Sequence, residues 1–179
     1  QPAITSDDLK TISDVLGTCT TDFSSSGAAR STNLAVGAGK INGRVLMPGE
    51  VISGYECLQP FTLENGYKTA AAYENGQVVD SIGGGVCQVS STMYRVAFQS
   101  GMQITFRRSH TFEPNYVTPG QDAAISWDIP DFRFINTSKA AIGIRANYSN
   151  RKMTVSFYGV PVLEDGITWS LESEKTDEL

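Results

Sequence analysis

The chain has 179 residues, 40% of them hydrophobic and 18% charged, and carries a formal net charge of −5. This composition is typical of one globular domain with a sizeable core, and the acidic balance argues against a nucleic-acid partner or an anionic membrane surface. No apolar run approaches membrane-spanning length, so we expect neither a transmembrane segment nor a signal peptide in what we take to be a fragment of a longer protein.

The first part of the chain is predicted to contain one helix between short strands. Residues 1–15 are expected to be a tail or the end of a preceding segment. Apolar residues at intervals of three and four predict a helix over residues 30–41, with Ser31 or Thr32 as its N-cap. Residues 50–64 mix apolar and polar positions irregularly and stay unassigned. The flanking strands are expected at residues 19–26 and 45–47.

A hairpin is predicted around Asn75-Gly76, because this dipeptide separates two strand-like runs. It leads into three consecutive glycines, Gly83 to Gly85, and then into Cys87. Apolar residues recur with helical spacing from that point, which predicts a helix from about residue 88 to residue 99. The hairpin strands are expected at residues 67–73 and 77–79.

The second half of the chain is predicted to consist mainly of strands. After Gly159 the sequence turns polar and acidic, which is typical of a linker. We therefore expect one folded domain over residues 16–159 and a C-terminal linker over residues 160–179. The expected fold class is α+β, a largely antiparallel sheet packed with two principal helices. The further strands are predicted at residues 103–107, 122–127, 132–135, 141–148 and 153–158.

Cys87 is the candidate nucleophile of the chain. A cysteine at the start of a helix lies beside free backbone N–H groups and the positive end of the helix dipole, both of which favour a thiolate. The same donors would stabilise an anion formed on a substrate carbonyl. The alternatives are a buried, inert cysteine or a phosphate-binding turn. The turn lacks the lysine of the Walker pattern and follows a hairpin, which argues against the second alternative.

His110 is the only histidine in the chain and is therefore the candidate base for a cysteine nucleophile. One helix and one strand separate it from Cys87, and such a return brings the end of the strand back towards the start of the helix. Asp122 and Asp131 are the candidates for orienting the imidazole, and Asp122 is preferred. The structural alternative is a histidine that satisfies its own hydrogen bonds and aspartates that form turns.

Several neighbouring residues are candidates for binding a substrate. Arg107 and Arg108 could hold a carboxylate in bidentate fashion or lie solvated at a strand end. The hydroxyls of residues 90–92 fit the first turn of a helix better than a nucleophilic role. The predicted substrate-binding set is Gly84, Gly85, Gln88, Ser90 and Arg108.

The three cysteines lack the spacing of a metal site, which argues against a closed zinc centre. We expect no metal and no cofactor. A disulfide between Cys19 and Cys57 would leave Cys87 free, but connectivity cannot be deduced from sequence, so this pairing stays open.

The run from Gly83 to Tyr94 resembles the signature of the VanW-like domain family. The resemblance covers roughly residues 16–159. Two departures stand out: the family's His-Pro-His-Ser segment is here Arg108-Ser109-His110-Thr111, and Cys19 and Cys57 fall where relatives are expected to carry other residues. Further matching segments are Ile41-Asn42-Gly43, Pro48-Gly49-Glu50, Glu64-Asn65-Gly66-Tyr67, Tyr116-Val117-Thr118-Pro119-Gly120-Gln121-Asp122-Ala123 and Asp131-Phe132-Arg133-Phe134-Ile135-Asn136.

The resemblance implies a cell-surface protein of Gram-positive bacteria, secreted or anchored to the membrane, whose partners are peptidoglycan stem peptides. Some clostridial members are L,D-transpeptidases, which form 3–3 cross-links from tetrapeptide stems through an acyl-enzyme. On this sequence Cys87 would be the nucleophile and His110 the base. The alternatives are a non-catalytic wall-binding module for glycopeptide resistance and a peptidoglycan hydrolase that uses the same cysteine.

Overall fold

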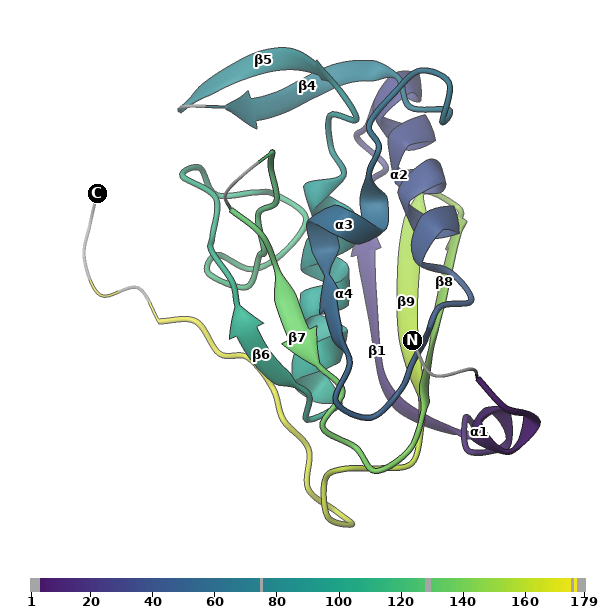
Figure 1. Cartoon of the computed structure of the whole chain (residues 1–179). Helices are drawn as coiled ribbons and strands as arrows, with labels where there is room; N and C mark the ends of the chain where they lie inside the picture. The colour runs from purple at the N-terminus through teal and green to yellow at the C-terminus, as the bar shows by residue number, and fades with distance from the viewer. Residues whose placement is uncertain (1–3, 75, 128–129, 175, 177–179) are drawn as a thin grey trace.

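The fold is α+β and is built around a four-stranded antiparallel sheet (Figure 1). The structure is a computed structural model that describes residues 4–74, 76–127, 130–174 and 176. The strand order β1-β9-β8-β2 pairs the first strand of the chain with the last one. The sheet consists of β1 (Asp14–Asp22), β2 (Val45–Leu46), β8 (Ile142–Ser149) and β9 (Lys152–Gly159).

Two helices, α2 (Ala28–Ile41) and α4 (Cys87–Gln99), pack against this sheet and confirm the expected pair of principal helices. Helix α4 contacts β1 and β9, whereas α2 contacts β8 (Figure 1). Burial of one large apolar side chain stabilises the fold by about 1.5–3 kcal/mol. Because several such side chains are buried between the helices and the sheet, their packing fixes the position of α4. These fully buried side chains include Leu34, Ile41, Val89, Met93, Val96 and Phe157.

Helix α2 begins earlier than predicted. Its N-cap is Gly27, and the prediction of Ser31 or Thr32 as the cap was wrong. Both hydroxyls lie inside the helix and donate to carbonyls four residues back, those of Gly27 and Ala28. A hydroxyl in this position satisfies itself on the preceding turn instead of capping the helix.

A second, three-stranded antiparallel sheet has the order β3-β7-β6. It consists of β3 (Val51–Ser53), β6 (Gln103–Phe106) and β7 (Arg133–Ile135), and the short helix α3 (Gly54–Leu58) follows β3. β3 and α3 occupy the segment that the sequence left unassigned. Phe134 of β7 stacks on Phe157 of β9, with ring centroids 5.4 Å apart, and this contact joins the two sheets in one core.

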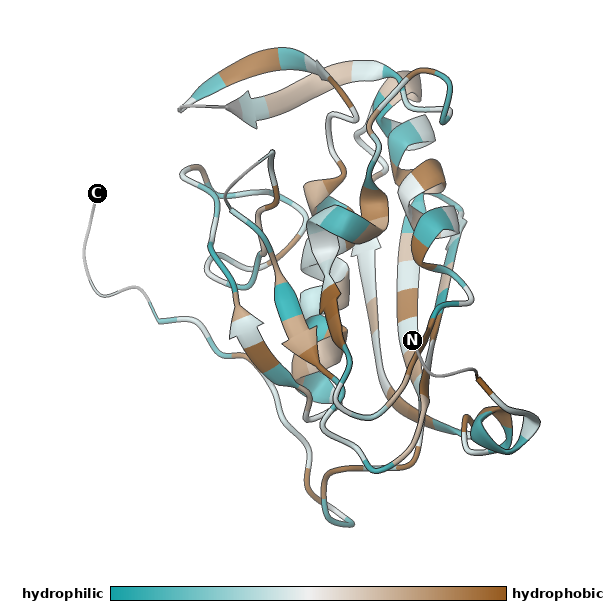
Figure 2. Ribbon diagram, in the orientation of Figure 1, coloured by the Kyte–Doolittle hydropathy of each residue, from teal (hydrophilic) through white to brown (hydrophobic). Residues whose placement is uncertain are grey.

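The predicted hairpin is confirmed as β4 (Thr69–Glu74) and β5 (Gln77–Ile82). It lies across the end of the molecule at which α4 begins (Figure 1). Figure 2 shows hydrophobic residues along β5, and the side chain of Val78 is 65% exposed. Tyr73 of β4 contacts the ring of His110 edge-on at 6.3 Å, so the hairpin covers the region of the predicted site.

The strand predicted at residues 122–127 is wrong, because this segment has no regular secondary structure. Its backbone bonds instead to side chains of α4. The N–H of Ala123 donates to Ser91 Oγ at 2.9 Å, and the carbonyl of Ile125 accepts from the Cys87 thiol at 3.3 Å. Backbone N–H and carbonyl groups that bond to side chains in this way are not available for hydrogen bonds to a neighbouring strand.

Both predicted end segments contain ordered contacts. Helix α1 (Ser6–Lys10) lies within the predicted tail, and β1 starts at Asp14, ahead of the strand expected from residue 19. Near the C-terminus Trp169 packs on Phe98 at 5.7 Å between ring centroids. The boundaries at residues 16 and 159 stay predictions, and residues 175 and 177–179 lie outside the described part of the chain.

All three cysteines are free, so the Cys19–Cys57 pairing left open above does not occur in this structure. Both of those residues are buried, and burial raises the pKa of the Cys57 thiol to about 11. No helix in the described part of the chain has the length and apolarity required to cross a bilayer.

Candidate active site at Cys87

The three glycines form the turn between β5 and α4, and the chain itself requires them. A Cβ atom on Gly84 would lie 2.2 Å from the carbonyl oxygen of Ala70, which belongs to β4. Gly85 has a φ of +98°, and a Cβ there would lie 2.6 Å from the side chain of Arg30. The backbone that approaches the turn closely is therefore that of β4 in the same chain.

Cys87 is the first residue of α4, as the sequence predicted, and is partly exposed. Its thiol donates to the carbonyl of Ile125 at 3.3 Å and also hydrogen-bonds with the imidazole of His110. Burial lowers the pKa of His110, whereas the hydrogen bonds to Asp122 and Cys87 and the charges of these two groups raise it, with a net rise to about 9. The structure therefore brings the predicted nucleophile and the predicted base together.

His110 is oriented by Asp122. Its ring Nδ1 lies 2.5 Å from Asp122 Oδ2, and its backbone N–H donates to the same oxygen at 2.7 Å. Burial raises the pKa of Asp122, but the hydrogen bonds and charge of His110 outweigh it and hold the pKa below its usual value. An ionised carboxylate only accepts hydrogen bonds, so Nδ1 carries a proton and Nε2 is left for the thiol.

Arg107 holds Asp122 in place. Its Nε donates to the backbone carbonyl of Asp122 at 2.7 Å, and its Nη2 lies 3.3 Å from Oδ1. The guanidinium also lies over the ring of Tyr94, 5.3 Å from the centroid. The guanidinium of Arg107 is therefore occupied by contacts within the protein. Of the two arginines predicted to bind a substrate carboxylate, only Arg108 has an exposed side chain.

Asp131, the second candidate for orienting the imidazole, lies elsewhere. Its carboxylate accepts from the Ser53 hydroxyl at 2.7 Å and the Tyr55 N–H at 3.0 Å, and it pairs with Arg133 at 2.7 Å. It therefore joins β3, α3 and β7 and does not contact His110.

Two serines of α4 attach the segment that carries Asp122. Ser90 Oγ donates to the carbonyl of Ala123 at 2.6 Å, and Ser91 Oγ accepts from its N–H. Both hydroxyls are fully buried. They fix the distance between α4, which carries Cys87, and the segment that orients His110.

The members of the predicted substrate-binding set lie in different environments. Gln88 is fully buried and donates to Thr21 and Asp22 on the β1 side of α4, and Ser90 is fully buried as described above. Gly84 is packed on β4. Only Gly85 and Arg108 are partly or fully exposed. Contact of any of the five with a substrate stays a prediction.

Two site residues escaped the sequence reasoning, Arg30 and Tyr116. Arg30 Cζ lies 5.7 Å from the centroid of the Tyr116 ring. Burial and the charge of Cys87 raise the pKa of Tyr116, although its hydrogen bond to Ser91 opposes that rise. Tyr116 lies within a segment that carried the family resemblance, which was a usable signal. Arg30 is 57 positions from Cys87 in sequence, and no motif around it marked it.

The backbone donors at the start of α4 are mostly occupied. The N–H groups of Val86, Gln88 and Val89 donate to carbonyls within the turn. Among the described residues, the N–H of Cys87 itself has no such partner. The N–H of Gly85 likewise has no such partner, so these two groups are the donors in the described turn that remain for an anion beside the thiol. No group of three or more His, Cys, Asp or Glu side chains in the described part of the chain is arranged to hold a metal ion.

Comparisons with known proteins bear on this site. The family model for VanW-like protein matches residues 29–158, which include Cys87, His110 and Asp122. The uncharacterized protein YoaR of Bacillus subtilis (strain 168) is 39% identical over 148 residues, which cover 83% of this chain and 49% of that protein. The vancomycin B-type resistance protein VanW of Enterococcus faecalis (strain ATCC 700802 / V583) is 28% identical over 126 residues, 68% of this chain and 46% of that protein. The chain spans about half the length of these curated relatives, and no solved structure matches it.

Proposed function

The chain belongs to the VanW-like protein family, and on that premise we propose that it is a cysteine-dependent L,D-transpeptidase that acts on peptidoglycan stem peptides outside the cell. The observation that carries the proposal is the contact of a partly exposed thiol, Cys87, with an imidazole whose other nitrogen is held by a buried carboxylate. Cysteine acyltransferases use this arrangement of nucleophile, base and orienting group.

The first half of the reaction acylates Cys87. His110 accepts the thiol proton, and the sulfur attacks the carbonyl carbon of the third residue of a tetrapeptide stem. The new C–S bond replaces the C–N bond to the fourth residue, and His110 returns the proton to the departing D-alanine amine. The pKa of about 9 favours the second of these two proton transfers, because the protonated imidazole is the major form at neutral pH; the neutral form, which accepts the thiol proton, is the minor one.

The second half transfers the acyl group. The side-chain amine of a diaminopimelate on another stem attacks the thioester, loses a proton to His110, and displaces the sulfur, which is then reprotonated. The backbone N–H of Cys87 supports both tetrahedral intermediates. Water in place of the amine would give hydrolysis, so mass analysis of the products separates a cross-linked dimer from a tripeptide.

The test is release of D-alanine from a disaccharide-tetrapeptide. We expect release by the wild-type chain and none by Cys87→Ala. Full turnover by the alanine variant would exclude Cys87 as the nucleophile.

One observation favours a second candidate, a non-catalytic wall-binding module that contributes to glycopeptide resistance. The hydrogen bond from Cys87 to the Ile125 carbonyl requires a protonated thiol. A Cys87 that does not react with iodoacetamide in the folded protein would support this candidate, and rapid alkylation would support the transpeptidase.

A further inference from the structure

Arg30 places a positive charge beside Cys87 that no internal carboxylate neutralises. Its side chain is half-buried and packs on Gly85, and its Nη1 donates to the hydroxyl of Ser26 at 2.6 Å. None of the ion pairs among the described residues involves Arg30. Half-burial of a guanidinium without a carboxylate partner is unfavourable, and this arrangement points to an anion supplied from outside.

The surroundings of Arg30 are those of the reactive thiol. Gly85 is two positions from Cys87, so their Cα atoms are at most about 7 Å apart. Burial lowers the pKa of Arg30, and the charges of Tyr116, Cys87 and Tyr73 raise it. The guanidinium remains charged at any physiological pH. A cation and a phenol therefore lie near the thiol: the guanidinium of Arg30 lies over the ring of Tyr116, which is hydrogen-bonded to Ser91.

We propose that Arg30 binds the C-terminal carboxylate of the residue that leaves, and so selects donor peptides that end one residue after the attacked carbonyl. In such a donor three covalent bonds separate the attacked carbon from the carboxylate carbon, which keeps them within about 4 Å. A guanidinium next to the nucleophile reaches that carboxylate without a further subsite and binds it in bidentate fashion. This assignment rests on the transpeptidase proposal and replaces Arg108 with Arg30 as the carboxylate-binding arginine.

Binding to the Cys87→Ala chain tests the assignment without turnover. Isothermal titration compares a tetrapeptide with a free C-terminal carboxylate and the same peptide ending in a carboxamide. We expect the carboxamide to bind on the order of tenfold to a hundredfold more weakly, because a charge-assisted bidentate pair is lost. Arg30→Gln should weaken binding of the carboxylate peptide by the same factor and leave the two peptides equal, whereas Arg30→Lys should keep part of the difference.

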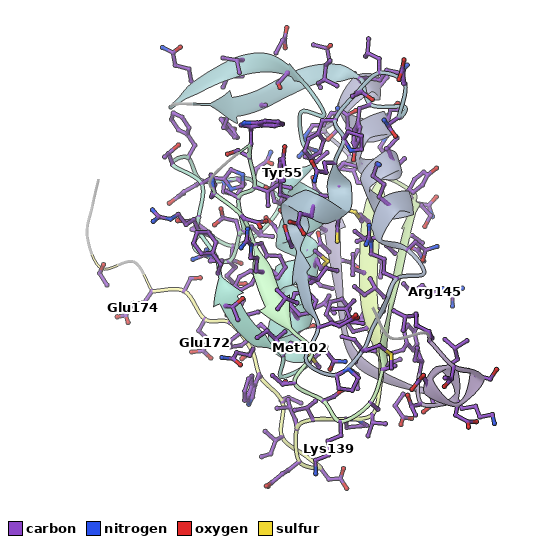
Figure 3. All side chains as sticks on the ribbon, in the orientation of Figure 1. Tyr55, Met102, Lys139, Arg145, Glu172 and Glu174 are labelled. Atoms are coloured by element: carbon purple, nitrogen blue, oxygen red, sulfur yellow. The ribbon has the colours of Figure 1, made fainter. Side chains whose placement is uncertain are left out.

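Arg145→Gln is the matched control, because Arg145 is exposed and points outward from β8 (Figure 3). It should bind both peptides as the parent chain does. Thermal unfolding and the rate of Cys87 alkylation in the otherwise wild-type Arg30→Gln chain show whether the variant remains folded with its turn intact. An Arg30→Gln chain that still prefers the carboxylate, or a parent chain that binds both peptides equally, would overturn the assignment.

The same peptides separate this inference from the transpeptidase proposal. Suppose that the donor with a free carboxylate releases D-alanine and the carboxamide donor releases alaninamide at the same rate. The transpeptidase then stands and the role of Arg30 fails. If the carboxylate preference in binding depends on Arg30 but no D-alanine is released, the binding role stands and the transpeptidase fails. With turnover, Arg30→Gln should raise KM much more than it lowers kcat.

Discussion

Asp122 Oδ2 accepts two hydrogen bonds from one residue, the ring Nδ1 of His110 at 2.5 Å and its backbone N–H at 2.7 Å. The carboxylate thus fixes both the position of the residue and the rotation of its ring. Arg107 and the serines of α4 hold the carboxylate in turn. The imidazole consequently has one nitrogen left, Nε2, and that nitrogen is the one available to the thiol of Cys87.

The variant Asp122→Asn tests whether Asp122 orients the imidazole of His110 or only stabilises the fold. An amide can donate to Nδ1 and so favour the wrong tautomer, which should slow acylation of Cys87 by on the order of a hundredfold. Stopped reactions analysed for released D-alanine measure this rate. Asp131→Asn is the matched control: it loses a buried carboxylate that contacts Ser53 and Arg133 and should lower the free energy of unfolding by roughly 1–3 kcal/mol without slowing acylation. Equal rates for Asp122→Asn and wild type would remove Asp122 from the mechanism.

The single imidazole makes the pKa of His110 directly measurable. Proton NMR of its Hε1 resonance requires no assignment, because the chain has one histidine. We expect a pKa well above 6.5, approaching about 9. Asp122→Asn and Cys87→Ala should each lower it, since each removes a hydrogen bond and a charge that raise it. A wild-type value at or below 6.5 would show that the thiol–imidazole–carboxylate contacts do not form in solution.

The raised pKa of His110 also predicts how stability depends on pH. A group whose folded-state pKa lies above its unfolded value stabilises the protein fully below the unfolded value, here 6.5, and loses that contribution as the pH rises through about 9. Urea unfolding of wild type and His110→Ala should therefore differ most at pH 6, by roughly 3 kcal/mol, and converge by pH 10. A difference that grows with pH would have the wrong sign for this pair.

The glycine turn can be tested apart from the chemistry. Gly84→Ala should destabilise the protein by roughly 2 kcal/mol or more, because the added Cβ would lie 2.2 Å from a backbone oxygen of β4 that cannot move aside. Gly39→Ala is the control, since Gly39 lies in α2 with no atom within 4 Å of an added Cβ. It should raise stability by about 0.5–1 kcal/mol. Thermal unfolding of both variants gives the comparison, and a neutral Gly84→Ala would mean that β4 does not pack on the turn.

The sequence predicted those elements that are marked by residues close together in the chain, such as a helical spacing or a turn dipeptide. Helical spacing predicted a helix from about residue 88 to residue 99, and the structure has α4 at Cys87–Gln99. Asn75-Gly76 identified the β4–β5 hairpin, although Asn75 itself lies outside the described residues. The pairing of β1 with β9 could not be predicted, because it joins residues at least 130 positions apart and the periodicity of a strand does not identify its partner.

The site was predictable to the same extent. Cys87, His110 and Asp122, which the structure brings together, were proposed from a helix start, a unique histidine and a choice between two aspartates. Arg30 could not be found, because its place depends on how the start of α2 packs against the turn at Gly85. The segment at residues 122–127 was mistaken for a strand because its partners are the side chains of Cys87, Ser90 and Ser91, and a binary pattern does not record such bonds.

Intact-protein mass after incubation with a tetrapeptide donor, in the absence of an acceptor, tests the central claim most directly. Formation of the thioester and loss of D-alanine predict a single adduct equal to the donor mass less that of D-alanine, located on the peptide that contains Cys87. Cys87→Ala should show no adduct, and His110→Ala should form it on the order of a hundredfold more slowly. An unmodified wild-type protein under conditions in which the donor binds, or an adduct that persists in Cys87→Ala, would contradict the account.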